Sequence, residues 1–240
     1  MPSDLCFHRT DSDGSKTTDE RIVQIWSIDP KNEWIWALTD HDRFNSDFVN
    51  QAKSVRIRTL WATEISARSE ELDLSLHVTC YTPWFSERIA TILDGVIEGR
   101  KQKIVWQIEK LKNHGFPISE ADFFAWVVSQ KMSPDSATNY HIAQYIWNSD
   151  AGRELAKGLT GWKVVTDIGF MRECLRENGD YPDIWYYRVP RYEPEISSLV
   201  TLAEKEGAII SIAHPNFSFT KKLNTDKKKK NREDRVRLFE

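Results

Sequence analysis

Residues 34–42 read WIWALTDHD, an apolar run that leads directly into four polar residues. The run 34–38 has the length and residue types of a buried strand, and helical patterns flank it on both sides. Strands that alternate with helices favour parallel pairing in βαβ units, and such folds collect their ligands at the carboxyl ends of strands. The stretch therefore predicts an α/β body with Asp40 and His41 at a functional edge of its sheet.

The same patterns extend through the first 82 residues and return near the carboxyl end. Apolar or alternating runs predict strands, whereas apolar residues at a spacing of three or four predict helices. Strands are expected at 5–7, 34–38, 56–61, 72–81 and 208–212, and helices at 17–28 with Thr18 as N-cap, at 43–54, and at 194–207 with a glycine stop. Residues 1–85 and 190–220 are accordingly assigned to one α/β body.

Residues 86–189 have the pattern of a helical insertion carried by that body. Helices are expected at 86–113 with His114-Gly115 as C-cap, from Ser119 onward with Asp122 in a capping box, and at 139–147. The charged tail 221–240 ends in a helix-like pattern, which we interpret as the start of a segment that the chain lacks.

Composition limits the possible partners and compartments. The chain has 240 residues, 40% of them hydrophobic, and a net charge of -3, so no global attraction to nucleic acid or membranes is expected. Its three cysteines lie far apart, which favours a reducing cytoplasm. No signal peptide or membrane-spanning run is predicted, and nothing in the sequence indicates a protein partner.

Potential metal ligands recur where the predicted strands end. Neutral imidazole and carboxylate groups are the ligands that hydrolytic metal centres use. Alternation along a strand would point Cys6 and His8 to one face, and a carboxylate such as Glu64 can bridge two ions. A single histidine is more often a packed or surface residue, so the prediction depends on the combination. The candidate ligands are Cys6, His8, Asp13, His41, Glu64, His77 and His214.

The order and spacing of these residues resemble the PHP family (polymerase and histidinol phosphatase domain). The matching segments are DLCFHRTDSDG at 4–14, ALTDHD at 37–42, TEIS at 63–66, LH at 76–77 and AHP at 213–215. Within the family, the chain resembles the small-substrate phosphoesterases with a helical insertion, whose members act on nucleoside mono- or bisphosphates or trim short oligonucleotides. Segments 100–115 and 139–143 match that insertion.

The resemblance implies a distorted (β/α)7 barrel that binds up to three divalent ions, manganese, zinc or iron. It places Cys6, His8 and Glu64 at the first ion, Glu64, His77 and His214 at the second, and Asp13 and His41 at the third. It also implies catalytic roles for Asp13, Asp40 and Glu64, and contacts of Arg100 and His141 with the phosphate of a small phosphorylated substrate.

The chain departs from the family pattern at three places. Cys6 stands where the family has histidine, Asn139 where the branch has arginine, and no Asp-x-His follows His214. The first and third ions would each lack a ligand, and the barrel would be incomplete. Two alternatives therefore accompany the phosphoesterase reading. One is a non-catalytic protein with the PHP fold, and the other is a metal-dependent C–N hydrolase, which would carry His-x-His where this chain has Cys6-Phe7-His8.

Overall fold

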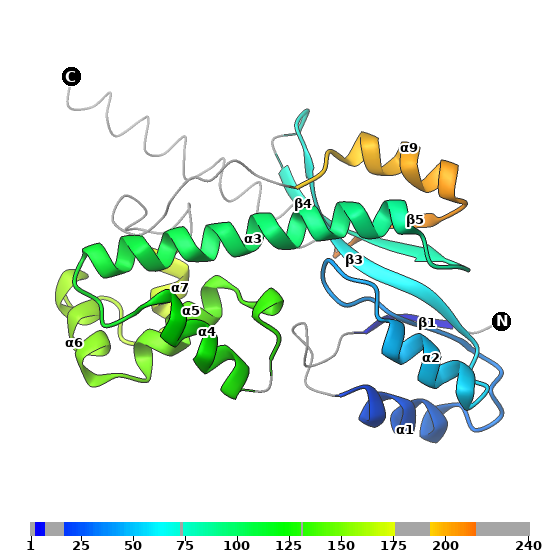
Figure 1. Ribbon diagram of the computed structural model, residues 1–240, viewed down its shortest axis with the longest axis horizontal. Coiled ribbons are helices and arrows are strands. Elements are labelled where there is room, and N and C mark those ends of the chain that lie inside the picture. Colours follow the sequence, from blue (N-terminus) through cyan, green and yellow to red (C-terminus); the bar gives the residue numbers. More distant parts are fainter. Residues whose placement is uncertain (1–2, 8–16, 73, 131, 176–192, 215–240) are drawn as a thin grey trace. The chain divides into compact units, whose positions relative to one another are not determined.

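The computed structural model describes residues 3–7, 17–72, 74–130, 132–175 and 193–214 (Figure 1). The chain divides into two compact units. We call Met1–Val96 with Glu193–Glu240 the sheet unit, and Ile97–Tyr192 the helical unit. Helix α3 (Glu87–Asn113) begins in the first and ends in the second. The tail predicted at 221–240 lies outside the described residues.

The sheet unit contains one five-stranded sheet in the order β1-β2-β3-β4-β5. Strands β1, β2 and β3 pair in parallel, whereas β3–β4 and β4–β5 pair antiparallel. The expected parallel pairing is thus confirmed for the first three strands only. The link 70–73 between β3 and β4 is too short for the crossover that a parallel partner needs. The bounds are β1 Ser3–Phe7, β2 Ile35–Leu38, β3 Thr59–Ser69, β4 Leu74–Thr82 and β5 Ile209–Ala213. This mixed α/β arrangement is consistent with part of a barrel.

Three further helices belong to the sheet unit, α1 (Thr18–Ile28), α2 (Ser46–Ser54) and α9 (Ile196–Glu206). The N-cap of α1 is Thr17, one residue before the predicted Thr18, and it forms a capping box with Glu20. Helix α2 begins later than predicted, with Asn45 as its N-cap. Helix α9 ends at Gly207, whose left-handed φ of 62° fits the predicted glycine stop.

The β3–β4 hairpin has one apolar face and one polar face. Ile65, Leu76 and Val78 belong to a buried cluster with Ile89 of α3 and Leu199 of α9. Figure 1 shows both helices on the same side of the hairpin. Burying each large aliphatic side chain contributes about 1.5–3 kcal/mol, so this face fixes the register of the hairpin. The opposite face is thereby left for polar side chains.

The helical unit is built around a separate apolar core that includes Phe123, Ile142 and Phe170, each fully buried. Helices α4 and α5 lie where the sequence predicts them, but two later helices have no counterpart in the prediction. The helices are α4 Glu120–Ser129, α5 Asn139–Trp147, α6 Asp150–Leu159 and α7 Asp167–Cys174, with a 3-10 turn at Pro134–Ser136.

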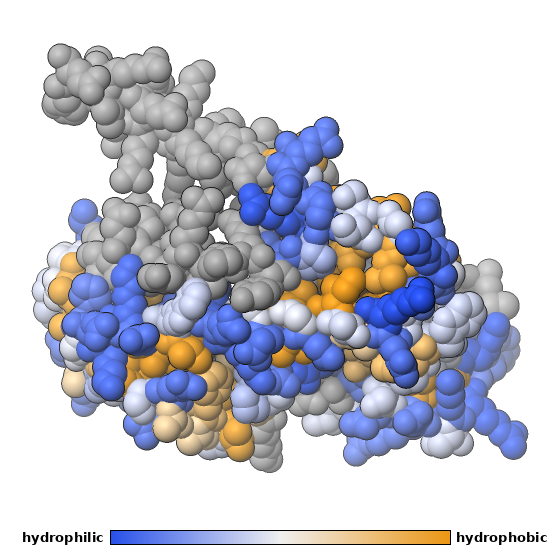
Figure 2. Space-filling model, turned by 45° about the horizontal axis from the view of Figure 1, so that its top comes forward, coloured by the Kyte–Doolittle hydropathy of each residue, from blue (hydrophilic) through white to orange (hydrophobic). Residues whose placement is uncertain are grey.

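The surface view in Figure 2 shows apolar areas that hydrophilic side chains interrupt. Scattered exposed apolar side chains are ordinary for a folded chain. In the part of the chain that the structure describes, no helix has the combination of length and hydropathy that crossing a membrane requires.

Candidate metal centre

Sheet register brings four candidate ligands into one row. His41 follows β2 and forms an isolated parallel bridge with Glu64 of β3. Ser66 pairs with His77 of β4, and His77 pairs with Ala213 at the end of β5. Residues two apart on a strand share a face, as do directly paired residues on neighbouring strands. Glu64 and His77 therefore both lie on the polar face of the hairpin.

The side chains converge on one carboxylate oxygen. Oε1 of Glu64 lies 2.6 Å from Nδ1 of His77, 3.7 Å from Nδ1 of His41 and 3.4 Å from Nε2 of His214. The ligand atoms of His41, Glu64 and His77 all lie within 4.8 Å of one another. The ring centroids of His41 and His77 are 4.9 Å apart, and those of His77 and His214 are 6.5 Å apart.

Solvent exposure is lowest at Glu64 and highest at His214. The side chain of Glu64 is 0% exposed, that of His41 19%, that of His77 44% and that of His214 52%. A buried carboxylate is costly unless cations or hydrogen-bond donors compensate its charge. The arrangement thus has a buried anionic centre and an open side that water and a substrate can reach.

His214 reaches the row through an unusual backbone conformation. If β5 continued in extended form, this side chain would point away from the face that Ala213 shares with His77. Its φ is instead 47°, in the left-handed region that few residues other than glycine adopt. Such conformations concentrate at functional sites, where the surrounding structure compensates their cost.

Asp40 lies beside this row and is fully buried. Its Oδ2 accepts a hydrogen bond from Nδ2 of Asn45, and Oδ1 of Asn45 in turn accepts one from the N–H of Phe48 at the start of α2. The carbonyl oxygen of Asp40 accepts from the N–H of Glu64. These contacts join α2 to β3, and the catalytic role expected for Asp40 stays a prediction.

The donor set fits a divalent transition metal. Imidazole nitrogens and a carboxylate oxygen are the ligands that zinc, manganese and iron accept. Two ligand atoms that share an ion at about 2.0–2.2 Å lie roughly 3–3.5 Å apart. The separations of Glu64 from His41 and His214 are close to this range, and the hydrogen bond to His77 would have to lengthen by less than about 1 Å.

The remaining candidates fall into two groups. His8 and Asp13 lie outside the described residues, as does the side chain of Cys6. Arg100, half-buried on α3, and His141 on α5 belong to the helical unit. Nδ1 of His141 accepts a hydrogen bond from the N–H of Thr138 at 3.0 Å, which caps α5, and burial lowers the pKa of this imidazole. The phosphate contacts expected of Arg100 and His141 stay predictions.

The residues now grouped overlap the grouping that the resemblance implies. Glu64, His77 and His214 lie together as that grouping has them, and His41 joins them. Asp13, the partner that the resemblance gives to His41, lies outside the described residues. Two polar residues beside the row, Asp42 and Ser66, are not among the candidate ligands, although both lie in segments that carry the resemblance, 37–42 and 63–66.

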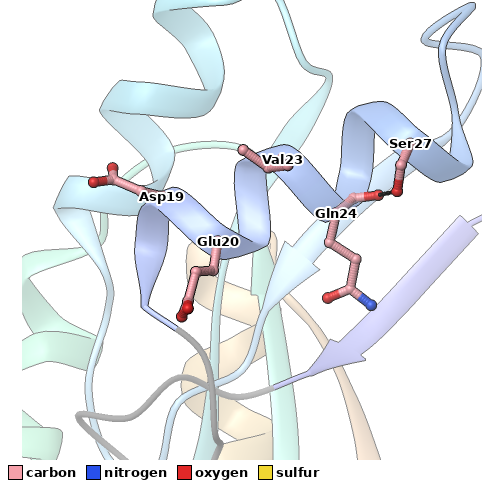
Figure 3. A pocket seen from close by; sticks show the side chains of 5 residues that line it. All are labelled: Asp19, Glu20, Val23, Gln24 and Ser27. Carbon is pink, nitrogen blue, oxygen red and sulfur yellow. Dashed lines mark hydrogen bonds between the residues drawn. The ribbon is translucent and has the colours of Figure 1, made fainter.

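A surface depression also lies along α1 (Figure 3). Its described lining consists of Asp19, Glu20, Val23, Gln24 and Ser27, all on this one helix. None of them is a candidate ligand, and the set contains no histidine or cysteine. The depression therefore adds nothing to the metal centre.

Comparison with known proteins supports the fold. No family model and no curated protein matches the chain. A solved structure from Bifidobacterium adolescentis, described as a "putative metal-dependent phosphoesterase", has a TM-score of 0.59 and 20% identity, and covers 88% of this chain and 66% of its own. An amidohydrolase from Chromobacterium violaceum, solved with sulfate and no metal, has a TM-score of 0.63 and 22% identity. The alignment covers 89% of this chain and 67% of the amidohydrolase chain.

This chain thus spans about two thirds of each neighbour's length. At such identities the likeness concerns the fold alone.

Proposed function

We propose that the chain is a metal-dependent hydrolase that cleaves phosphate esters of small phosphorylated substrates, such as nucleotides or short oligonucleotides. The observation that carries this proposal is the buried carboxylate of Glu64 with three imidazole nitrogens 2.6–3.7 Å from one of its oxygens. The PHP-like order of these residues and the likeness in fold to a described phosphoesterase support it.

A bound divalent ion would supply an acidified water and neutralise charge on the phosphoryl oxygens. The residues of the chain provide the setting for this chemistry. Glu64 contributes a buried negative charge, and His41 lies on its less exposed side. The more exposed rings of His77 and His214 leave an approach for water and substrate. In this reading Glu64, together with Asp13 and Asp40, belongs to the catalytic set.

The finer expectations from the family resemblance form part of the same proposal. Cys6, His8 and Asp13 would complete a site for up to three ions in a (β/α)7 barrel, and a cysteine ligand would favour zinc or iron over manganese. Arg100 and His141 would bind the substrate phosphate. A cytoplasmic location fits the two buried free thiols, Cys80 and Cys174.

A second candidate function is C–N bond hydrolysis, because one structural neighbour is described as an amidohydrolase. The same neighbour holds a sulfate, a tetrahedral anion with the shape of phosphate. That anion is a reason to rank phosphate esters first. A third candidate is a non-catalytic, metal-poor protein with the same fold, which Cys6 in place of the histidine of the PHP pattern favours.

The test combines metal analysis with a substrate screen on the full chain. The metal-depleted protein is titrated separately with MnCl2, ZnCl2 and FeCl2, and each loaded form is then given nucleoside mono- and bisphosphates, short oligonucleotides and a panel of amides. We expect metal-dependent phosphate release that Glu64→Gln abolishes. Glu71→Gln is the matched control, because Glu71 is exposed in the turn after β3. Amide cleavage alone would favour the second function, and absence of turnover with every ion would favour the third. Absence of metal binding would overturn the first two.

A further inference from the structure

Asp42 contacts the strand that carries Glu64. This aspartate is fully buried, and both of its carboxylate oxygens accept hydrogen bonds from Ser66. Oδ1 accepts from the N–H of Ser66 at 2.6 Å, and Oδ2 accepts from its Oγ–H at 2.9 Å. Asp42 therefore clamps the loop after β2 to β3.

Main-chain hydrogen bonds continue this clamp on both sides of His41. The N–H of Asp42 donates to the carbonyl of Glu64 at 2.8 Å, and the N–H of Glu64 donates to the carbonyl of Asp40 at 3.1 Å. The loop thus runs beside β3 past the end of β2. His41 is held between two anchored neighbours and directly opposite Glu64.

The position of Ser66 extends the effect to the next strand. Ser66 is paired with His77 in the sheet register, and it lies two residues after Glu64 on the same face. The carboxylate of Asp42 therefore fixes the strand segment that faces His77 as well as the loop that carries His41. Asp42 also has a left-handed φ of 54°, a conformation that few residues other than glycine adopt.

We propose that Asp42 is a positioning residue that sets the spacing of His41, Glu64 and His77 through Ser66, and that metal affinity depends on this clamp. The inference rests on the proposed function only in taking the three residues as metal ligands. Hydrogen-bond partners of ligands hold ligand geometry, and their loss typically weakens metal affinity by about 10–100-fold.

Three substitutions of Asp42 separate geometry from charge. Asp42→Asn keeps an acceptor for the N–H of Ser66 and tolerates the left-handed backbone, but it loses the negative charge. Asp42→Gly keeps the backbone freedom and loses the acceptor, whereas Asp42→Ala loses both. Ser66→Ala removes one hydroxyl donor and leaves the remaining contacts, so it serves if the alanine variant of Asp42 fails to fold.

Asp29 offers a matched control in the same unit. It is also a buried aspartate, and its two oxygens accept hydrogen bonds from the N–H groups of Glu33 and Trp34, each at 2.9 Å. It contacts none of the candidate ligands in these bonds. Asp29→Ala should lower the stability of the fold and leave the metal affinity of the folded chain unchanged.

The experiment measures MnCl2 binding by calorimetry and the visible absorption of the Co2+-loaded full chain. We expect Asp42→Ala and Asp42→Gly to weaken Mn2+ binding by about 10–100-fold and to change the Co2+ bands. Ser66→Ala should weaken binding in the same direction, and Asp42→Asn should stay within about threefold of the parent chain.

Parent-like affinity in Asp42→Ala, or in Ser66→Ala if that variant must replace it, would overturn the inference. An Asp42→Asn variant that binds Mn2+ as weakly as Asp42→Gly would also overturn it, because the charge of Asp42 rather than its position would then determine the affinity. If the parent chain binds Mn2+ and hydrolyses nothing, the proposed activity fails while the positioning role stands. If the parent chain hydrolyses its substrate and Asp42→Ala binds Mn2+ as tightly as the parent chain, the proposed activity stands and the positioning role fails.

Discussion

Glu64 and His77 form a diagonal pair across the β3–β4 hairpin, with 2.6 Å between Oε1 and Nδ1. In the sheet register Glu64 is opposite Thr79, and His77 is opposite Ser66. The hydrogen bond therefore depends on side chains that lean toward one another along the polar face. Because Glu64 is fully buried, its charge needs cationic or hydrogen-bonding partners, and this need underlies the first prediction.

A divalent ion should stabilise the folded chain. A ligand present at 100 times its Kd adds about 2.7 kcal/mol to the free energy of unfolding when it binds only the folded state. Thermal unfolding with and without MnCl2 or ZnCl2 measures this shift, and EDTA should reverse it. Glu64→Gln should lose the shift and Glu71→Gln should keep it. An equal shift in both variants would place the ion elsewhere.

The histidines of the row should not contribute equally to the affinity for an ion held by the compact group. His41, Glu64 and His77 form the compact group, whereas His214 lies on the outer side with half of its side chain exposed. We expect His41→Ala and His77→Ala to weaken Mn2+ binding by about tenfold or more, and His214→Ala to have a smaller effect. Calorimetry measures the three affinities. A larger loss in His214→Ala would mean that the ion prefers the outer side.

Two of the cysteines should resist alkylation in the folded chain. Burial raises the pKa of Cys80 to about 12, and burial together with the nearby charge of Glu173 raises that of Cys174 to about 12. Only about one thiol in 10,000 would then be ionised at pH 8, and the thiolate is the reactive form. Iodoacetamide followed by peptide mapping should find both thiols unlabelled in buffer and labelled in urea. Rapid labelling of Cys80 in buffer would contradict its place in the core.

His141 should make the stability of the fold depend on pH. Its pKa is lowered by burial, so the unfolded chain binds the proton more readily. The contribution of the neutral ring to the free energy of unfolding is complete above the ordinary histidine pKa, about 6.5. This contribution is lost as the pH falls from there through the lowered pKa. Urea unfolding between pH 8 and pH 5 measures the slope.

His141→Gln is the informative comparison for this slope. Glutamine at the third helical position can still accept the capping hydrogen bond from Thr138, and it does not titrate. The variant should match the parent chain at pH 8 and lose less stability on acidification. An unchanged slope would assign the acid sensitivity to other histidines.

The sequence alone predicts much of the sheet unit. Apolar runs overlap each described strand, and the same reasoning supplies His41, Glu64, His77 and His214 as candidate ligands. The expectation that the ligands lie at strand ends is wrong for two of them, because β3 runs on to Ser69 and Glu64 and His77 lie within β3 and β4. Sequence order also does not reveal register. The link between β3 and β4 has no glycine or asparagine to signal a hairpin, so the pairing that brings Glu64 beside His77 is visible only in three dimensions.

The residues that support the site are harder to predict for a physical reason. Asp42 and Ser66 are 24 positions apart, and their hydrogen bonds follow from the course of a loop rather than from any periodic pattern. Helix α6 was missed because Gly152 and Gly158 weaken a helical signal in a segment of ten residues. Its start depends on the cap from Ser149, which only the structure reveals.

The pairing of β4 with β5 has a consequence for the order of events during synthesis. Thr79 and Ser211, which are paired across these strands, are separated by 132 positions. At about 5–20 residues per second, a ribosome needs roughly 7–26 s to make that interval. His41, Glu64 and His77 are therefore all translated well before His214. On the ribosome the chain therefore carries the whole compact group of candidate ligands before the strand that delivers His214 exists.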